Sequence, residues 1–258
     1  MELNSDIKLQ LINGVPIFVN GIGYVYPLTI KEIAMCIESK YNSVIGLFTR
    51  ELHDLDIDDI EECEFTYFDF LIFTCAKDDL IKNTVEDVLS KILRSPVTLE
   101  KEKMCFFIGD KSKDVEADKV KLIDNETIKD FADVLRFQNC IEKTQPKKKK
   151  KKVTNSKVEM LKQKRNSGRK LLREAKGEDF CMAEIQSTLG VLYNDLNKVG
   201  DMTIYQLNDQ YSKIMRKEKY DKEYSSYLAG ADPKKLELNT HWSAKQKAKD
   251  MDNIAPPN

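Results

Sequence analysis

Cysteine and histidine supply many metal ligands, nucleophiles and bases, and this chain offers little of that chemistry. Six cysteines are spread through 258 residues without a Cys-x-x-Cys pair, and the two histidines, His53 and His241, lie in different regions. A zinc site needs several closely spaced ligands, and a catalytic triad needs a base beside its nucleophile. We therefore expect no metal, no cofactor, no catalytic residue and no enzymatic activity. Four cysteines with apolar neighbours are expected to be buried, reduced thiols: Cys36, Cys75, Cys105 and Cys181.

Carboxylates are concentrated between Asp54 and Glu64, where a calcium loop would be one interpretation. An EF-hand loop needs a central glycine and a terminal glutamate in a fixed register, and this stretch has neither. A run of like charges is usually solvated, so we predict a loop or the start of a helix here.

Basic residues are concentrated in a second stretch, which begins after Pro146. Such a segment attracts phosphate backbones without regard to sequence, so nonspecific nucleic-acid binding is one hypothesis. No aromatic residue for base stacking occurs between Gln145 and Phe180, which favours a solvated linker and basic helix instead. The candidate nucleic-acid-binding residues are Lys147, Lys148, Lys149, Lys150, Lys151, Lys152, Arg165, Arg169 and Arg173.

The charge distribution divides the chain. Residues 1–145 carry 17 basic and 28 acidic side chains, a net of −11, whereas the remainder carries 42 − 17 = 25 basic and 43 − 28 = 15 acidic ones, a net of +10. We predict an acidic module over 1–144, a basic linker or helix over 145–177, and a helical module with a frayed tail over 178–258. No apolar run approaches the ~18–20 residues of a membrane span and no secretory signal is visible, so we expect a cytoplasmic protein without a membrane partner.

The acidic module is predicted to be α+β, with a small β-hairpin or sheet packed on helices. Strand formers over residues 7–26 are interrupted by Asn13-Gly14 and Asn20-Gly21, which are typical of tight turns. Thr29 and Glu32 have capping-box spacing, and the apolar residues that follow predict one helix reaching Tyr41. Further helices are predicted over 80–92 and 128–138, strands over 104–108 and 120–123, and an aromatic core segment over 65–75.

The C-terminal module is predicted to be all-helical. Apolar periodicity begins after Asp179, breaks at Val199-Gly200-Asp201, and resumes behind a second capping box formed by Thr203 and Gln206. The tyrosines at 220, 224 and 227 are expected to extend the apolar stripe of this second helix, and Gly230 to end it. A tyrosine stripe with a late tryptophan, Trp242, is most often core, although it could also form an exposed docking face.

Several stretches of the chain are similar to a known family. The segments 23–33 (GYVYPLTIKEI) and 120–128 (VKLIDNETI) resemble parts of tail assembly chaperone-like proteins from phages of low-GC Gram-positive bacteria. The segments 202–209 (MTIYQLND) and 227–231 (YLAGA), followed by His241-Trp242, resemble the ending of that family, of a frameshift-extended type. The order of these segments carries the resemblance, which covers most of the chain apart from the connector.

The resemblance implies a non-enzymatic assembly factor of the bacterial host cytoplasm, which binds the phage tape-measure protein and keeps it soluble during tail tube assembly. It also implies that residues 153–258 extend a shorter product by ribosomal frameshifting at the six lysines. The major tail tube protein and a second copy of the chain are further candidate partners. The alternatives are a nucleic-acid-associated protein and a structural tail component retained in the virion. The candidate client-binding residues are Phe65, Tyr67, Phe68, Phe70, Tyr205, Leu207, Tyr211 and Trp242.

Overall fold

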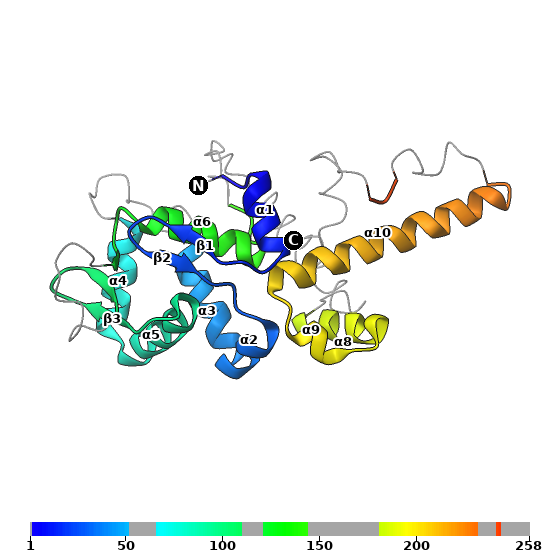
Figure 1. The fold of residues 1–258 in the computed structure, drawn as a ribbon. Coiled ribbons are helices and arrows are strands. Elements are labelled where there is room, and N and C mark those ends of the chain that lie inside the picture. Colours follow the sequence, from blue (N-terminus) through cyan, green and yellow to red (C-terminus); the bar gives the residue numbers. More distant parts are fainter. Residues whose placement is uncertain (1, 52–65, 110–120, 144–180, 232–240, 244–258) are drawn as a thin grey trace, which may run out of the picture. The chain divides into compact units, whose positions relative to one another are not determined.

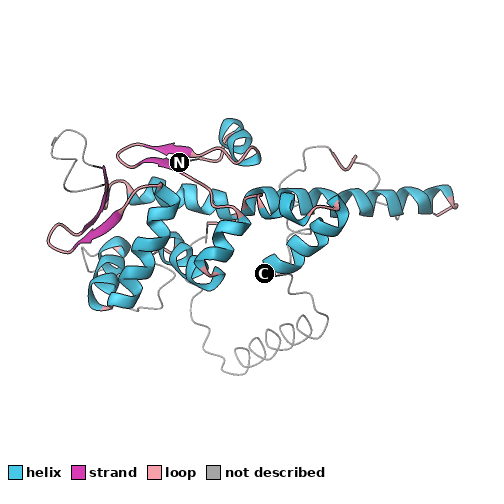
Figure 2. Ribbon diagram, turned by 60° about the horizontal axis from the view of Figure 1, so that its bottom comes forward, coloured by secondary structure: helices cyan, strands magenta, loops and turns pink. Residues whose placement is uncertain are grey.

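The computed structural model describes residues 2–51, 66–109, 121–143, 181–231 and 241–243, in two compact units (Figure 1). Unit 1 comprises Met1–Pro146 together with Asn197–Gln206, and unit 2 comprises Lys147–Leu196 and Leu207–Asn258. A short segment from the C-terminal half of the chain thus belongs to the N-terminal unit. The described chain consists of helices with a few short antiparallel strands (Figure 2), which confirms the predicted α+β class.

Unit 1 contains most of the described elements. Its helices are α1 (Ser5–Ile12), α2 (Ile30–Cys36), α3 (Glu38–Thr49), α4 (Tyr67–Lys77), α5 (Asp79–Leu93) and α6 (Ile128–Asn139). Its strands are β1 (Ile17–Val19), β2 (Gly23–Val25), β3 (Val97–Glu100), β4 (Cys105–Ile108) and β5 (Lys121–Ile123). The later helices are α8 (Met182–Tyr193), α9 (Leu196–Gly200) and α10 (Ile204–Leu228).

The start of unit 1 differs from the prediction. Residues 5–12 form helix α1, where strands were expected, and the reason is local. The Asn4 side chain accepts a hydrogen bond from the Ile7 N–H at 2.9 Å, which caps the helix, and Ile7 and Leu11 are buried one turn apart. The predicted Asn20-Gly21 turn is confirmed: it joins β1 to β2, with Gly21 at φ +78°.

The core of unit 1 lies around the three-stranded sheet β3–β4–β5. Phe106, in the middle strand, is fully buried, and its ring lies 5.9 Å from that of Phe48 in α3 and 6.4 Å from that of Phe68 in α4. Phe131 of α6 meets Phe48 edge-on at 5.7 Å. Strands β4 and β5 were predicted, but β3 was not. The sheet and three helices therefore share one aromatic centre.

Where a single helix was predicted to run on to Tyr41, the chain breaks at Ile37. The capping box at its start is confirmed, since Thr29 Oγ1 accepts from the Glu32 N–H and Glu32 accepts from the Thr29 N–H. Ile37 has φ +68° and ψ 111°, which separates α2 from α3. A β-branched residue is strained at positive φ, so this corner stores conformational energy.

A side-chain hydrogen bond joins the two described helices of unit 2, α8 and α10. The Tyr193 hydroxyl of α8 donates to Gln210 Oε1 of α10. The predicted end of α10 is confirmed, because Gly230 has φ +93° and its N–H donates to the Tyr227 carbonyl at 3.0 Å. At 100° per residue, however, Tyr220, Tyr224 and Tyr227 lie on nearly the opposite face of α10 from Ile204, Leu207, Tyr211 and Ile214. The tyrosines form a second stripe and do not extend the first.

Replacing Ile37 by glycine tests the strained corner. Ile37→Gly is expected to raise the free energy of unfolding by about 1 kcal/mol, since the positive φ costs a β-branched residue more than it costs glycine. The matched control is Met35→Gly, at a helix position that is 80% exposed, which should lower that free energy by about 1 kcal/mol. Urea unfolding of both variants measures the difference, and equal losses in both would contradict the strain.

Candidate interaction surfaces

Some residues that the sequence analysis singled out for binding lie outside the described residues. Phe65 of the candidate client-binding set is one of them, and so are the carboxylates between Asp54 and Glu64. The entire candidate nucleic-acid-binding set, Lys147 to Arg173, also falls there. The structure does describe the other seven candidate client-binding residues, which it places in different surroundings.

The aromatic residues of α4 separate into core and surface. Phe68 is buried against Phe106, so it belongs to the core. Tyr67 and Phe70 are half-buried, with their rings 6.1 Å apart, and the Tyr67 hydroxyl donates to the Leu47 carbonyl at 2.8 Å. Phe73, in contrast, is largely exposed, although the whole aromatic segment was predicted to be core. Helical periodicity explains the mixture, since α4 buries one face and exposes the other.

The candidate residues of the C-terminal half are mostly covered. Leu207 is buried, Tyr205 and Tyr211 are half-buried, and burial raises the pKa of Tyr211. Trp242 is half-buried beside His241, whose ring lies edge-on 5.3 Å from that of Tyr220 on α10. These residues are not gathered into one exposed aromatic surface.

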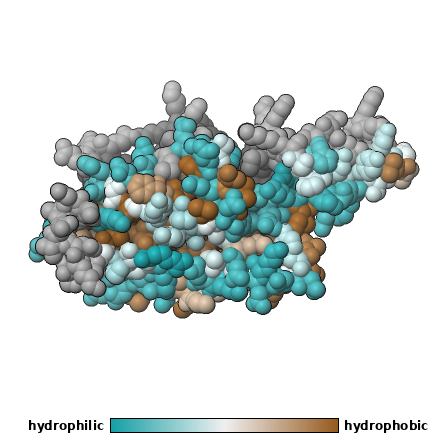
Figure 3. All heavy atoms as spheres, viewed as in Figure 1, coloured by the Kyte–Doolittle hydropathy of each residue, from teal (hydrophilic) through white to brown (hydrophobic). Residues whose placement is uncertain are grey.

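An exposed aromatic pair occurs elsewhere, on the β1–β2 hairpin. Phe18 and Tyr24 stand directly opposite in the strand register, their rings meet edge-on at 5.4 Å, and each side chain is 56% exposed. The alternate residues Ile17, Val19 and Val25 are buried on the other face. Period-two alternation around Asn20-Gly21 could have identified this pair from the sequence. Figure 3 shows further hydrophobic residues gathered nearby over α1, which exposes Leu9 and Ile12.

The inner face of the hairpin is fixed by backbone hydrogen bonds. Gln138 of α6 donates through Nε2 to the Val25 carbonyl at 3.0 Å, and the Tyr26 N–H donates to the Ile92 carbonyl at 2.9 Å. The Leu122 N–H donates to the Gly21 carbonyl, so the turn is attached to β5. The aromatic pair thus stands on a fixed strand pair, which lowers the entropy that a partner must remove on binding.

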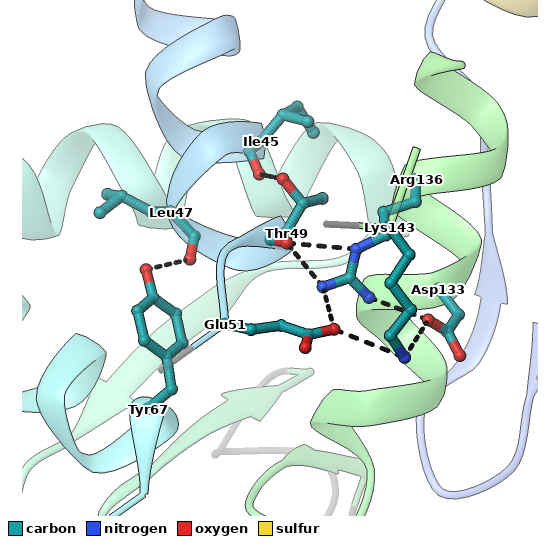
Figure 4. A network of polar contacts seen from close by, with 8 residues as sticks. All are labelled: Ile45, Leu47, Thr49, Glu51, Tyr67, Asp133, Arg136 and Lys143. Carbon is teal, nitrogen blue, oxygen red and sulfur yellow. Dashed lines mark hydrogen bonds and ion pairs between the residues drawn. The ribbon is translucent and has the colours of Figure 1, made fainter. Parts of the chain in front are cut away.

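A polar network joins the end of α3 to α6 (Figure 4). The Arg136 guanidinium donates to the Thr49 carbonyl at 3.1 and 2.6 Å and to Asp133 at 2.9 Å, and it lies 3.3 Å from Glu51. Lys143 adds a second cation, 3.4 Å from the same glutamate. Arg136 and Asp133 are both buried, so their charges are matched inside the protein. The network stabilises the scaffold by joining the end of α3 to α6.

The segment 197–206 contacts the rest of unit 1 where the start of α10 lies beside the start of α2. Thr203 forms an isolated antiparallel bridge with Thr29, and the Ile30 N–H donates to the Met202 carbonyl at 2.9 Å. The second predicted capping box is confirmed, with Gln206 Oε1 accepting from the Thr203 N–H at 2.8 Å. Through Nε2 the same Gln206 side chain donates to the Ile12 carbonyl at 2.9 Å.

The cysteines of the described residues differ in burial. Cys36, Cys75 and Cys105 are buried as expected, and burial, with Glu86 nearby, raises the pKa of Cys75 to about 11. Cys181 is exposed, contrary to the prediction. Within the described ranges, no group of three or more His, Cys, Asp or Glu side chains is placed to hold a metal ion.

One comparison relates the C-terminal half to known proteins. Residues 176–247 match the family described as the YomV second domain, which is a phage-related family. No curated protein and no solved structure matches the chain. Among the described helices, none is both long and apolar enough to span a membrane.

Replacing Arg136 by methionine tests the polar network. Arg136→Met should lower the free energy of unfolding by about 3 kcal/mol, because it leaves the buried Asp133 carboxylate without its closest cation. Lys143→Met removes a cation whose side chain is 53% exposed, and it should cost less than about 1 kcal/mol. Chemical denaturation measures the free energy of unfolding of both variants. An equal loss in the two variants would contradict the conclusion that Arg136 is the main partner of the buried Asp133 carboxylate.

The Glu32 carboxylate should make stability depend on pH. Burial alone would raise the pKa of Glu32, but the Thr29 N–H and the Arg94 guanidinium outweigh it and hold the pKa below its ordinary value of 4.5. A group with a lowered folded pKa stabilises the fold above its unfolded pKa, and that stabilisation is lost as the pH falls through the folded pKa. The wild-type protein should therefore lose stability below about pH 4.5 more steeply than the Glu32→Gln variant. At pH 7 the variant should be less stable than the wild-type protein. Thermal unfolding against pH measures this, with Glu38→Gln at an exposed site as the control.

Proposed function

We propose that the chain is a non-enzymatic assembly chaperone of a phage tail, which acts in the bacterial host cytoplasm. It binds the tape-measure protein and keeps that protein soluble while the major tail tube protein polymerises around it. The observation that carries the proposal is the exposed Phe18–Tyr24 pair on a fixed hairpin. A clustered apolar surface on a rigid scaffold suits the apolar stripe of a helical client better than it suits solvent.

Two likenesses, which overlap in the C-terminal half of the chain, support this assignment. The resemblance to tail assembly chaperone-like proteins includes residues 23–33, which hold strand β2 and the capped start of α2. The match of residues 176–247 is to a phage-related family. Both support a phage protein, and we propose the assembly role from the resemblance.

The six lysines from Lys147 to Lys152 fit a chain made in two lengths. Lysine codons are rich in adenine, and a run of them would suit ribosomal slippage. We propose that a shorter product ends near Lys152 and that residues 153–258 are the extension. Mass spectrometry of the protein from infected cells, purified through a tag at its N-terminus, tests this by the presence of both lengths.

Co-expression with the tape-measure protein of the same phage tests the client surface. The full chain should raise the soluble fraction of that protein and copurify with it, and Phe18→Ser with Tyr24→Ser should abolish both effects. Stability of the double variant should change by less than about 1 kcal/mol, because both rings are largely exposed.

The matched control is Phe73→Ser, which removes an exposed aromatic ring from α4 and should leave the client soluble. Loss of binding in Phe73→Ser alone would move the client surface to α4. Absence of any effect of the wild-type chain, with nucleic acid retained on the purified protein, would favour the basic segment. Recovery of the chain from purified virions in a fixed stoichiometry would favour a structural tail component.

A further inference from the structure

The contact between segment 197–206 and the rest of unit 1 has the features of a specific docking site. It combines a backbone bridge, a side chain-to-backbone hydrogen bond and an ion pair, the last between Lys31 and Asp201 at 2.8 Å. The segment also buries apolar groups, since Val199 and Met202 are covered. Directional hydrogen bonds select one register, and buried side chains stabilise it.

Two backbone groups of unit 1, the Ile30 N–H and the Ile12 carbonyl, find their hydrogen-bond partners in segment 197–206. Ile30 is the first residue of α2, and the N–H groups of a first helical turn have no partner inside their own helix. The Ile30 N–H is satisfied by the Met202 carbonyl. At the end of α1, the Ile12 carbonyl is satisfied by Gln206. The end of α1 and the start of α2 therefore contact the same segment.

The covalent connection does not dictate which copy of the chain supplies the segment. Between Lys143 of unit 1 and Cys181 before α8 lie residues 144–180, which number 180 − 144 + 1 = 37. A chain of that length spans up to ~130 Å when extended, so the segment could reach the site of another molecule as well as its own. The contacts in the site are the same in either case, which is the condition for exchange of an element between copies.

We propose that the surface around Ile12, Thr29 and Ile30 is a docking site for the segment 197–206, and that a second copy of this chain can supply the segment in trans. Two chains that exchange their segments form a reciprocal dimer with one symmetric pair of sites. The single-chain arrangement dominates in dilute solution, because the local segment is always close by. The exchanged form dominates as the protein concentration rises.

Two variants each remove one partner of this contact: Gln206→Glu changes the segment, and Ile30→Pro changes the surface on which the segment docks. Gln206→Glu keeps the acceptor for the Thr203 N–H, so the capping box remains, but it removes the donor to the Ile12 carbonyl. Ile30→Pro removes the N–H that donates to Met202 and also shortens a buried side chain, at the first helical position, where the proline backbone fits. The matched control is Asn208→Asp, which makes the same change of charge two residues further along α10.

Hydrogen exchange of the Ile30 amide reports occupation of the site. In the full-length Gln206→Glu chain this amide should exchange about tenfold faster than in the wild-type chain, whereas Asn208→Asp should leave it unchanged. Adding an excess of unlabelled Ile30→Pro chain, whose segment is intact, to ¹⁵N-labelled Gln206→Glu chain should restore protection. Sedimentation of the mixture should then show a heterodimer that neither variant forms alone.

Three results would overturn the proposal. The first is wild-type protection of Ile30 in Gln206→Glu, which would mean that the segment is not held through this contact. The second is fast exchange that persists at a large excess of the Ile30→Pro chain, which would exclude docking in trans. The third is a mixture that sediments only as monomers. Should Gln206→Glu fail to fold, Asp201→Lys weakens the same contact from an exposed position and enters the same experiment.

Discussion

The burial of aromatic rings around Phe106 is the constraint on which the rest of unit 1 depends. The ring occupies the middle strand of the three-stranded sheet, and Phe48 and Phe68 approach it from α3 and α4. Phe131 extends the cluster to α6, so one apolar centre orders the elements from residue 38 to residue 139. Helix α6 contributes Phe131 to this centre, and α5 packs against α3, α4 and β3 beside it. These two helices anchor the β1–β2 hairpin through its backbone. The hairpin then exposes its aromatic pair without folding it into the core.

Unit 1 is completed by a segment from far along the chain. The hydrogen bond from Gln206 to the Ile12 carbonyl joins residues 194 positions apart, and it lies beside the bridge between two capped helix starts. The backbone groups at helix termini have no partner within their own helix. Here the groups at two termini form hydrogen bonds with the one segment 197–206. A fold closed in this way links the N-terminal scaffold to the long helix α10, whose first turn is part of the contact.

Buried polar groups and exposed apolar groups lie in different parts of unit 1. The buried charges of Arg136 and Asp133 satisfy one another, and the buried thiol of Cys75 is held in its neutral form by burial. Exposed apolar surface is instead found on the hairpin and on α1. Residues 176–247 match a phage-related family, and the assembly role remains our proposal.

Helix starts and turns could be predicted because their signals are local. The capping boxes at Thr29 and Thr203 and the turn at Asn20-Gly21 each form within a few residues, so spacing alone identified them. The strands expected at residues 7–12 were wrong because apolar residues there fit both a two-residue and a four-residue period, and the Asn4 cap with burial of Ile7 and Leu11 selected the helix. Strand β3 was not predicted, and it becomes recognisable through its antiparallel pairing with β4. Which aromatic rings stay exposed, and the meeting of Thr29 with Thr203, depend on contacts between distant residues, and only the tertiary structure decides those.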